Sequence, residues 1–257
     1  MDEYSHIKGI NVPAVVTGKP VEIGGSLGRD TATAQGGYYV LENILKKMKL
    51  KARGLSVAIQ GFGNAGMNFA KIASAHGFKV VAVSDSQGGI HLEKGLDIDQ
   101  VIKHKATAGS VINFSGAKNV TNEKLLELPV KILVPAALEK AIDKDNARRI
   151  KADIILELAN GPITSEASET LRKKGKLVIP DILANSGGVI VSYFEWVQNI
   201  RHFYWDMEKV QLNLSKKITL ATDLVWQRKE DFKLDMRTAA YILAMERLLK
   251  ALEIRGI

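Results

Sequence analysis

One glycine-rich segment of the chain has the spacing of a turn that binds phosphate groups. It reads QGFGNAG at residues 60–66 and carries the pattern G-x-G-x-x-G. An apolar run precedes the segment and a helical pattern follows it, which is the context that this pattern requires. The first glycine permits a tight turn, the second lets the backbone approach a pyrophosphate, and the third lets the helix pack closely on the strand. The candidate cofactor contacts are Gly61, Phe62, Gly63, Asn64, Ala65 and Gly66.

An acidic side chain follows the next apolar run along the chain. Asp85 and Ser86 stand at the end of that run, about 20 residues beyond the glycines. A carboxylate at this strand tip accepts hydrogen bonds from the adenosine ribose of a dinucleotide. The same charge repels a 2′-phosphate, so we expect NAD rather than NADP. Two alternatives stay open: Asp85 only caps its loop, or a lysine or arginine brought close by the fold permits NADP.

Alternating strand and helix patterns position these residues. Apolar runs bounded by glycines predict strands, and periodic apolar patterns predict helices between them. The predicted strands are 55–60, 79–84, 131–134, 153–158 and 177–179. The predicted helices are 31–49, 64–76, 96–105, 143–150 and 165–174. Because parallel neighbours need a crossover, this order predicts an α/β fold of the Rossmann type, with a doubly wound and mostly parallel sheet.

The two ends of the chain depart from this alternation. Residues 1–28 are rich in glycine and contain prolines, so we expect a loop there, with Asp30 as the N-cap of the following helix. After the strands, three helices are predicted at 190–203, 206–229 and 236–253. We therefore expect a dinucleotide-binding Rossmann domain over residues 1–200 and a C-terminal helical segment over residues 201–257.

The composition excludes several kinds of site. The chain has no cysteine, which excludes disulfides and thiolate chemistry and fits the reducing cytoplasm, our expected location. The five histidines lack metal-ligand spacing, so we expect no metal. No apolar run approaches the roughly 18 residues that span a bilayer, so we expect no membrane contact. The net charge of +8 permits a nucleic-acid partner. We expect none, because the densest basic runs lie near predicted helix ends, where the helix dipole favours them.

Several motifs together resemble the cofactor-binding half of glutamate dehydrogenase, in the Glu/Leu/Phe/Val dehydrogenase family. They are TGKP at 17–20, GGSLGR at 24–29, the glycine turn at 60–66, ELANGP at 157–162 and NSGGVIVSYFEWVQN at 185–199. The resemblance runs essentially from Met1 to Ile257. Leucine and phenylalanine dehydrogenases share the glycine turn, but SYFEWVQN is not expected in them. The resemblance implies reversible oxidation of L-glutamate to 2-oxoglutarate and ammonium, with hydride passing to a nicotinamide.

The resemblance also implies roles for residues outside the glycine turn. It places Arg29 and Thr33 in the cleft near substrate and nicotinamide, and Ser192 against the distal carboxylate of glutamate. The residues that it implies near the nicotinamide are Ala159, Asn160 and Asn185. Without the resemblance, Asn185 is a plausible helix cap, Arg29 a solvated loop residue, and Ser192 a helix hydroxyl bonded to its own backbone.

The two catalytic groups of the family are not found in this chain. The family uses a lysine in a P-x-G-G-A-K-G-G segment and an aspartate in a P-A-P-D-like segment, and neither motif occurs here. We therefore name no catalytic residue and expect an isolated second domain with negligible turnover of glutamate. Hydride transfer needs the substrate and an acid/base group held beside the nicotinamide. The alternatives are a non-catalytic dinucleotide-binding module and the cofactor domain of another amino-acid dehydrogenase.

We expect this chain to associate with other chains, on two grounds. The resemblance implies a homo-oligomer, a hexamer, for the full-length family. In that family the C-terminal region returns toward the substrate domain, so apolar groups left exposed here are expected to mediate self-association. The aromatic residues concerned are Tyr193, Phe194, Trp196, Phe203, Tyr204 and Trp205, of which at least half are expected to be core.

Overall fold

A seven-stranded sheet in the order β4-β3-β2-β1-β5-β6-β7 forms the centre of the structure. This computed structural model describes the whole chain, residues 1–257. Five strands are parallel: β1 (Ser56–Gln60), β2 (Lys79–Asp85), β5 (Ile132–Pro135), β6 (Ile154–Leu156) and β7 (Leu177–Ile179). Two short strands, β3 (Gly88–His91) and β4 (Lys118–Val120), continue the sheet beyond β2 in antiparallel fashion. The predicted doubly wound, mostly parallel α/β fold is confirmed.

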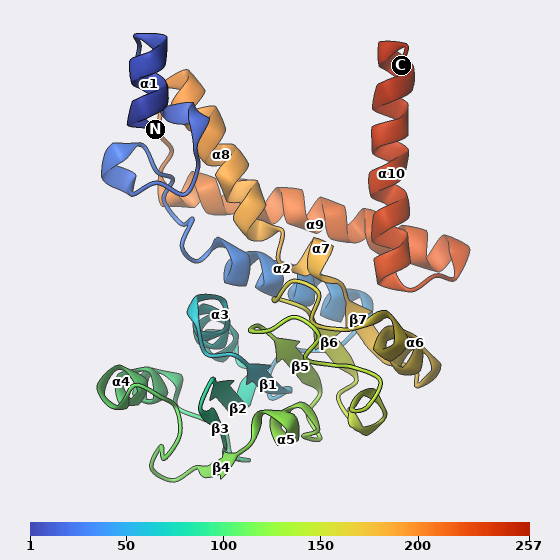
Figure 1. The fold of residues 1–257 in the computed structure, drawn as a ribbon. Helices are drawn as coiled ribbons and strands as arrows, with labels where there is room; N and C mark the ends of the chain where they lie inside the picture. Colours follow the sequence, from blue (N-terminus) through green and yellow to red (C-terminus); the bar gives the residue numbers. More distant parts are fainter.

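Helices cover both faces of the sheet (Figure 1). One face packs on α2 (Ala32–Lys47), α3 (Asn64–Ala75) and α4 (Ile98–Ala108), and the other on α5 (Asn122–Leu126) and α6 (Ser165–Lys173). Successive strand side chains point to opposite faces. In β1, Val57 and Ile59 therefore join the larger apolar cluster, while Ala58 joins the second cluster under α5 and α6.

The strand order reverses at β1, and this reversal positions the candidate site. The chain passes from β1 to β2 on one side and later returns to place β5 on the other side of β1. The loops that follow β1 and β5 therefore diverge, which opens a crevice at the carboxyl ends of these strands. Open α/β sheets bind their ligands at such a point.

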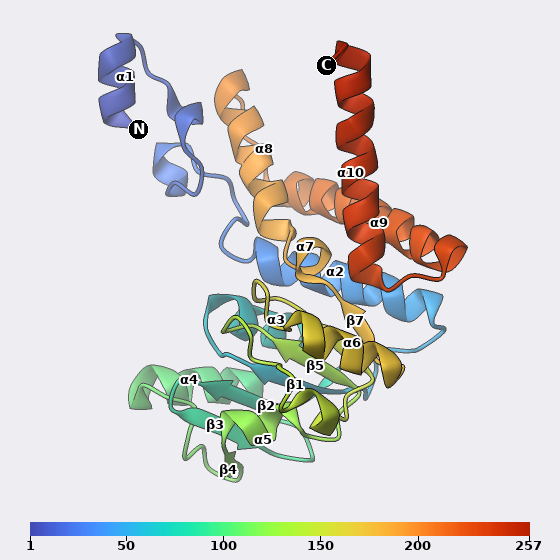
Figure 2. The same cartoon turned by 45° about the vertical axis from the view of Figure 1, so that its right-hand side comes forward.

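The C-terminal part is helical, as the sequence predicts. It consists of α7 (Asp181–Ala184), α8 (Gly187–Arg201), α9 (Met207–Phe232) and α10 (Met236–Arg255). Figures 1 and 2 show α8 and α10 projecting away from the sheet in the same direction, while α9 lies alongside α2. No helix of the structure combines the length and the apolarity that a membrane span requires.

A buried ion pair ties the start of α10 to the sheet. Arg237 Nη2 donates to both carboxylate oxygens of Glu157, each at 2.5 Å, and Arg237 Nη1 donates to Asp181 at 2.9 Å. The Glu157 side chain is fully buried. Burial raises the pKa of Glu157 to about 7, although Arg237 and the Asp181 amide favour the carboxylate. This pair connects the ELANGP motif to the first turn of the last helix.

The N-terminal segment is more ordered than predicted. Residues 1–28 contain the helix α1 (Asp2–Lys8) and two short 3-10 helices, η1 (Pro13–Val15) and η2 (Val21–Ile23), so the expectation of a loop was partly wrong. Asp30 is not the cap of α2. Thr31 holds that position without a side-chain hydrogen bond, and the backbone oxygen of Asp30 accepts from the Asn64 side chain at 2.8 Å.

Several short elements differ from the prediction or were missed. The predicted helix at 143–150 is reduced to the three-residue 3-10 helix η3 (Ala147–Arg149). Strands β3 and β4 and the five-residue helix α5 were not predicted. Strands β6 and β7 have only three residues but were predicted, because each is an unbroken apolar run. The elements β3, β4 and α5 have no such run and too little periodicity to identify.

Candidate functional site

The glycine turn after β1 has the backbone geometry that its sequence predicts. Gly61 has a φ of +96°, and a Cβ there would lie 2.6 Å from the Cβ of Ala137 in the loop after β5. A Cβ on Gly66 would lie 1.8 Å from the backbone oxygen of Gly61. Only glycine fits at these two positions, because the turn is left-handed and α3 packs directly against it.

The start of α3 presents unpaired amide groups to open space. The first residue before the helix, Gly63, gives no side-chain cap, and Met67 is the first residue whose amide bonds back into the turn. The amides of Gly63, Asn64, Ala65 and Gly66 donate to no group of the chain. A Cβ on Gly63 would meet no atom within 4 Å. A helix start with free amides and open space in front of it is suited to an anion.

A cavity of about 630 Å³ lies beside this turn, between the ends of β1, β2 and β5. Gly61, Phe62 and Gly63 line it together with Asp85 and Ser86, so the structure brings the two predicted motifs together. The side chain of Phe62 is 1% exposed and belongs to the core. Phe62 therefore offers a ligand its backbone rather than its ring.

Asp85 is surrounded by hydrogen-bond donors of its own chain. Its Oδ1 accepts from the amide of Gln87 at 3.1 Å and the hydroxyl of Ser110 at 2.9 Å. Its Oδ2 accepts from the amide of Val111 at 2.9 Å and the ammonium of Lys105 at 3.2 Å. Burial favours the neutral acid, but these donors outweigh it and hold the pKa of Asp85 below its usual value. Asp85 thus does cap its loop, and it is also a charged group at the cavity wall.

Lys105 is a site residue that the sequence analysis did not identify. It reaches from α4 to Asp85, and it also donates to the backbone oxygen of Phe62 at 3.0 Å. Lys105 lines the cavity and places a positive charge where the ribose of a dinucleotide is predicted. No local pattern distinguishes this lysine from others on the chain, because only the packing of α4 brings it to the turn.

The residues predicted near the substrate also come together. Arg29 Nε donates to Ser192 Oγ at 2.8 Å, so neither the solvated-loop interpretation of Arg29 nor a backbone bond of Ser192 is found. A Cβ added to Gly188 would lie 2.8 Å from Thr33 Oγ1 and 3.4 Å from an Arg29 nitrogen, which puts these side chains beside the start of α8. This cluster is joined to the glycine turn through the bond from Asn64 to the backbone of Asp30.

Helix α8 holds the segment that carries Arg29. The carboxylate of Glu195 is fully buried, pairs with Lys19 Nζ at 2.6 Å and accepts the amide of Gly18 at 2.8 Å. Further along the helix, Gln198 donates to Ser26 Oγ at 3.0 Å and Asn199 donates to the Gly24 backbone at 2.8 Å. Charged and polar side chains of α8 therefore hold the loop that ends in Arg29 in place through hydrogen bonds and an ion pair.

The residues predicted near the nicotinamide form a second cluster. Asn185 Nδ2 donates to Asn160 Oδ1 at 2.7 Å, and Ala159, next in the chain, is buried. The alternative that Asn185 caps α8 is not found. Ser186 precedes that helix, without a side-chain cap bond.

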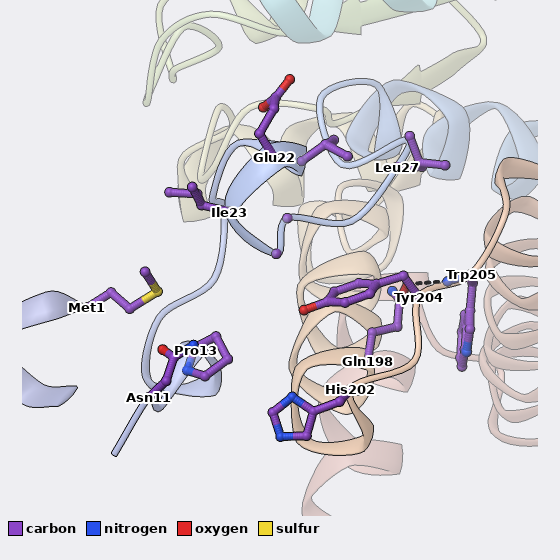
Figure 3. Close-up of a pocket in the computed structure, with 13 residues that line it drawn as sticks. Met1, Asn11, Pro13, Glu22, Ile23, Leu27, Gln198, His202, Tyr204 and Trp205 are labelled. Carbon is purple, nitrogen blue, oxygen red and sulfur yellow. Dashed lines mark hydrogen bonds between the residues drawn. The ribbon is translucent and has the colours of Figure 1, made fainter. Parts of the chain in front are cut away.

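A separate cavity of about 470 Å³ lies between the N-terminal segment and the end of α8 (Figure 3). Tyr204, Trp205 and His202 line it, and the amide of Trp205 donates to Gln198 Oε1 at 2.8 Å. None of the residues predicted to bind cofactor or substrate lines this cavity. The structure holds no group of three or more His, Asp and Glu side chains that is suited to a metal ion.

The aromatic residues near the C-terminal helices divide between core and surface. Phe194 is buried and Trp205 is partly buried. The exposed members are Tyr193, Trp196, Phe203 and Tyr204. The expectation that at least half of the six are core is therefore wrong, because α8 projects away from the sheet (Figure 2).

Comparison with known proteins gives a consistent result. A family model described as Glutamate/Leucine/Phenylalanine/Valine dehydrogenase matches residues 24–256. The glutamate dehydrogenase of Thermotoga maritima is 50% identical to this chain, the NADP-specific enzyme of Synechocystis 46%, and the NAD-specific enzyme of Staphylococcus aureus 44%. All of this chain is aligned in each case, but it spans only 62% of each relative's length.

Solved structures agree with the sequences. The hetero-hexameric glutamate dehydrogenase of Thermus thermophilus, in a leucine-bound form, superposes with a TM-score of 0.93 at 40% identity, over 100% of this chain and 61% of that one. The enzyme of Peptoniphilus asaccharolyticus superposes with a TM-score of 0.86 at 32% identity, over 99% of this chain and 61% of that one. With the family match over residues 24–256 and the shared fold, this chain belongs to the Glutamate/Leucine/Phenylalanine/Valine dehydrogenase family, a family of oxidoreductases.

Proposed function

We propose that this chain is the dinucleotide-binding part of an NAD(P)-dependent glutamate dehydrogenase. Within it, residues 1–200 form the nucleotide-binding domain and residues 201–257 the helical segment. The observation that carries the proposal is the set of free amides at the start of α3, which face open space beside Gly63. A pyrophosphate there would satisfy those amides and interact favourably with the helix dipole.

The remaining predicted contacts would lie along the bound dinucleotide, from its adenosine end to its nicotinamide end. Asp85 and Ser86 lie on the adenosine side of the glycine turn, and Ala159, Asn160 and Asn185 lie on the proposed nicotinamide side. The nicotinamide supplies the hydride acceptor of the family's reaction. In this proposal, Arg29 and Thr33 line the cleft at the junction of cofactor and substrate, with Ser192 oriented toward the distal carboxylate of glutamate.

NAD is the proposed preferred cofactor, and the positive charge of Lys105 would also permit NADP to bind. The pKa of Asp85 lies below its usual value, so its carboxylate is charged at neutral pH and repels a 2′-phosphate. Lys105 offsets this charge at 3.2 Å, which weakens the discrimination. Among the relatives, the Staphylococcus aureus enzyme is named NAD-specific and the Synechocystis enzyme NADP-specific.

We further propose that the chain by itself does not turn over glutamate. The family's lysine and aspartate motifs do not occur in it, so no group here is placed to move the amine proton. The rest of the relatives' length is the proposed source of those groups and of the second wall of the cleft. Glutamate and 2-oxoglutarate are therefore proposed partners only when that part is present, as is the assembly into a homo-oligomer.

Two measurements on the purified chain test this function. Isothermal titration with NAD and NADP in parallel is expected to show one site per chain and tighter binding of NAD. A steady-state assay with glutamate and NAD is expected to show negligible rates until a separately produced substrate domain is added. An absence of any dinucleotide binding contradicts the proposal, and near-enzyme rates of the chain alone contradict the catalytic part of it.

A further inference from the structure

One polar side chain in the cofactor cavity has no partner in the chain. Gln60, the last residue of β1, lines the cavity, yet its Oε1 is buried and accepts no hydrogen bond. The residue is 5% exposed. A buried amide oxygen without a donor is costly, and native structures contain few of them.

The position of Gln60 separates it from the groups that bind phosphate. Side chains alternate along β1, so Gln60 points to the same face as Ala58, the face covered by α5. In the sheet, Gln60 pairs with Ser84 of β2 and Pro135 of β5. It therefore lies at the central crevice, on the opposite side of β1 from the apolar contacts of Ile59.

Most of the residues that line the cavity with Gln60 are polar or charged, but four apolar side chains also line it. Leu126, Ala137, Leu138 and Ala141 line the cavity with it. The carboxylate of Asp85 already accepts four hydrogen bonds, whereas the buried Oε1 of Gln60 accepts none. A ligand with apolar faces and a hydrogen-bond donor on its edge would complement both these apolar side chains and the Gln60 amide.

We propose that the Gln60 amide reads the edge of the adenine base of the bound dinucleotide. A glutamine amide recognises adenine by accepting from its exocyclic amine and donating to its ring nitrogen N7. The last torsion of a glutamine side chain is soft, so the amide turns to present either end to the cavity. Gln60 is then a specificity-determining residue for the base. This inference rests on the proposed function, because it assumes that a dinucleotide occupies the cavity.

The test compares NAD with nicotinamide hypoxanthine dinucleotide, in which a carbonyl replaces the adenine amine. Calorimetric titration of the unaltered chain is expected to show about tenfold weaker binding of the hypoxanthine analogue. Gln60→Met keeps the length of the side chain and removes the amide. This variant is expected to bind NAD and the analogue equally, both about tenfold more weakly than the unaltered chain binds NAD.

Thermal unfolding of the ligand-free variant shows whether a loss of binding comes from the missing amide or from a less stable fold. Gln60→Met removes an unpaired buried oxygen, so its melting temperature is expected to equal or exceed that of the unaltered chain. Gln227→Met, at an exposed position of α9, is the matched control and is expected to change nothing.

The outcomes are distinguishable. If the unaltered chain binds no NAD, the proposed function fails. If it binds NAD and the analogue equally, or if Gln60→Met still discriminates between them, the function stands and the role of Gln60 is overturned. The comparison of the two ligands on the unaltered chain holds even if the variant does not fold.

Discussion

Arg29 Nε donates a hydrogen bond to Ser192 Oγ across 2.8 Å, joining two residues that lie 163 positions apart in the chain. Both were predicted to lie near substrate, and the bond joins α8 directly to the loop before α2. The buried pair of Lys19 and Glu195 holds the same two segments together. The proposed substrate side of the site is therefore preorganised by contacts far from the cofactor.

The bond between Arg29 and Ser192 predicts a change in stability without a change in cofactor binding. Ser192→Ala removes the acceptor and is expected to lower the free energy of unfolding by about 1 kcal/mol. Its dissociation constant for NAD is expected to stay within about twofold, because Ser192 does not line the cavity beside the glycine turn. Urea denaturation and calorimetry measure the two quantities. Ser215→Ala on α9 is the control, and a large loss of NAD affinity in Ser192→Ala would contradict the assignment.

Substituting alanine at two glycines of the same motif is predicted to change the free energy of unfolding by very different amounts. Gly66→Ala places a Cβ against the Gly61 backbone and is expected to destabilise the chain by about 3 kcal/mol or more. Gly63→Ala adds a Cβ in open space at a negative φ, so the free energy of unfolding is expected to stay nearly constant. Denaturant titration of both variants checks this, and equal losses would show that the turn is not packed as described.

Removing the charge of Lys105 is predicted to change the relative affinities of the chain for NAD and NADP. Lys105→Met leaves the charge of Asp85 uncompensated, so affinity for NADP is expected to fall by a larger factor than affinity for NAD. Parallel titrations with both cofactors give the ratio. Lys103→Met, two residues earlier on α4 and without an ion pair, is the control. A lower ratio of NAD to NADP affinity in Lys105→Met would contradict the role of Lys105.

The network around Asp85 predicts a pH dependence of stability. Because the pKa of Asp85 is lowered in the folded state, its stabilising effect is present above its ordinary pKa of 3.8 and is lost as the pH falls through the lower folded value. The difference in unfolding free energy between the unaltered chain and Asp85→Asn is therefore expected to be constant from about pH 7 to 5 and to shrink below about pH 4. A difference that grows on acidification would show the sign to be wrong.

The ion pair of Arg237 and Glu157 predicts a large loss of stability when one partner is removed. Arg237→Met leaves the fully buried Glu157 without its counter-ion and is expected to cost about 3–5 kcal/mol. Arg228→Met breaks a pair with Glu246 that is partly exposed on both sides, and it is expected to cost less than about 1 kcal/mol. Denaturant unfolding of the two variants measures the contrast, and similar losses would contradict it.

The strands and the glycine turn were predictable because their signals are local. Runs such as the one ending at Gln60 are mostly apolar, and the three glycines follow at a fixed spacing. The partners of Asp85 were not predictable in the same way. Ser110, Val111 and Lys105 come from α4 and the loop after it, and only tertiary packing brings them to the strand tip.

The same reasoning explains what was missed at the chain's N-terminus. Glycines and prolines in residues 1–28 indicate a loop, but they do not show that polar groups of α8 bind it. Each of those bonds joins residues more than 170 positions apart. The resemblance to a family identified the motifs on both segments, whereas the hydrogen bonds between them required the fold.

The central claim is that the free amides at the start of α3 bind a pyrophosphate, and Gly63→Val tests it most directly. The valine side chain enters space that is open in the ligand-free chain, so the variant is expected to fold with an unchanged circular dichroism spectrum. Calorimetric titration with NAD is expected to give a clear binding isotherm for the unaltered chain and none for Gly63→Val. Equal affinities in the two titrations would show that the dinucleotide does not bind at this turn.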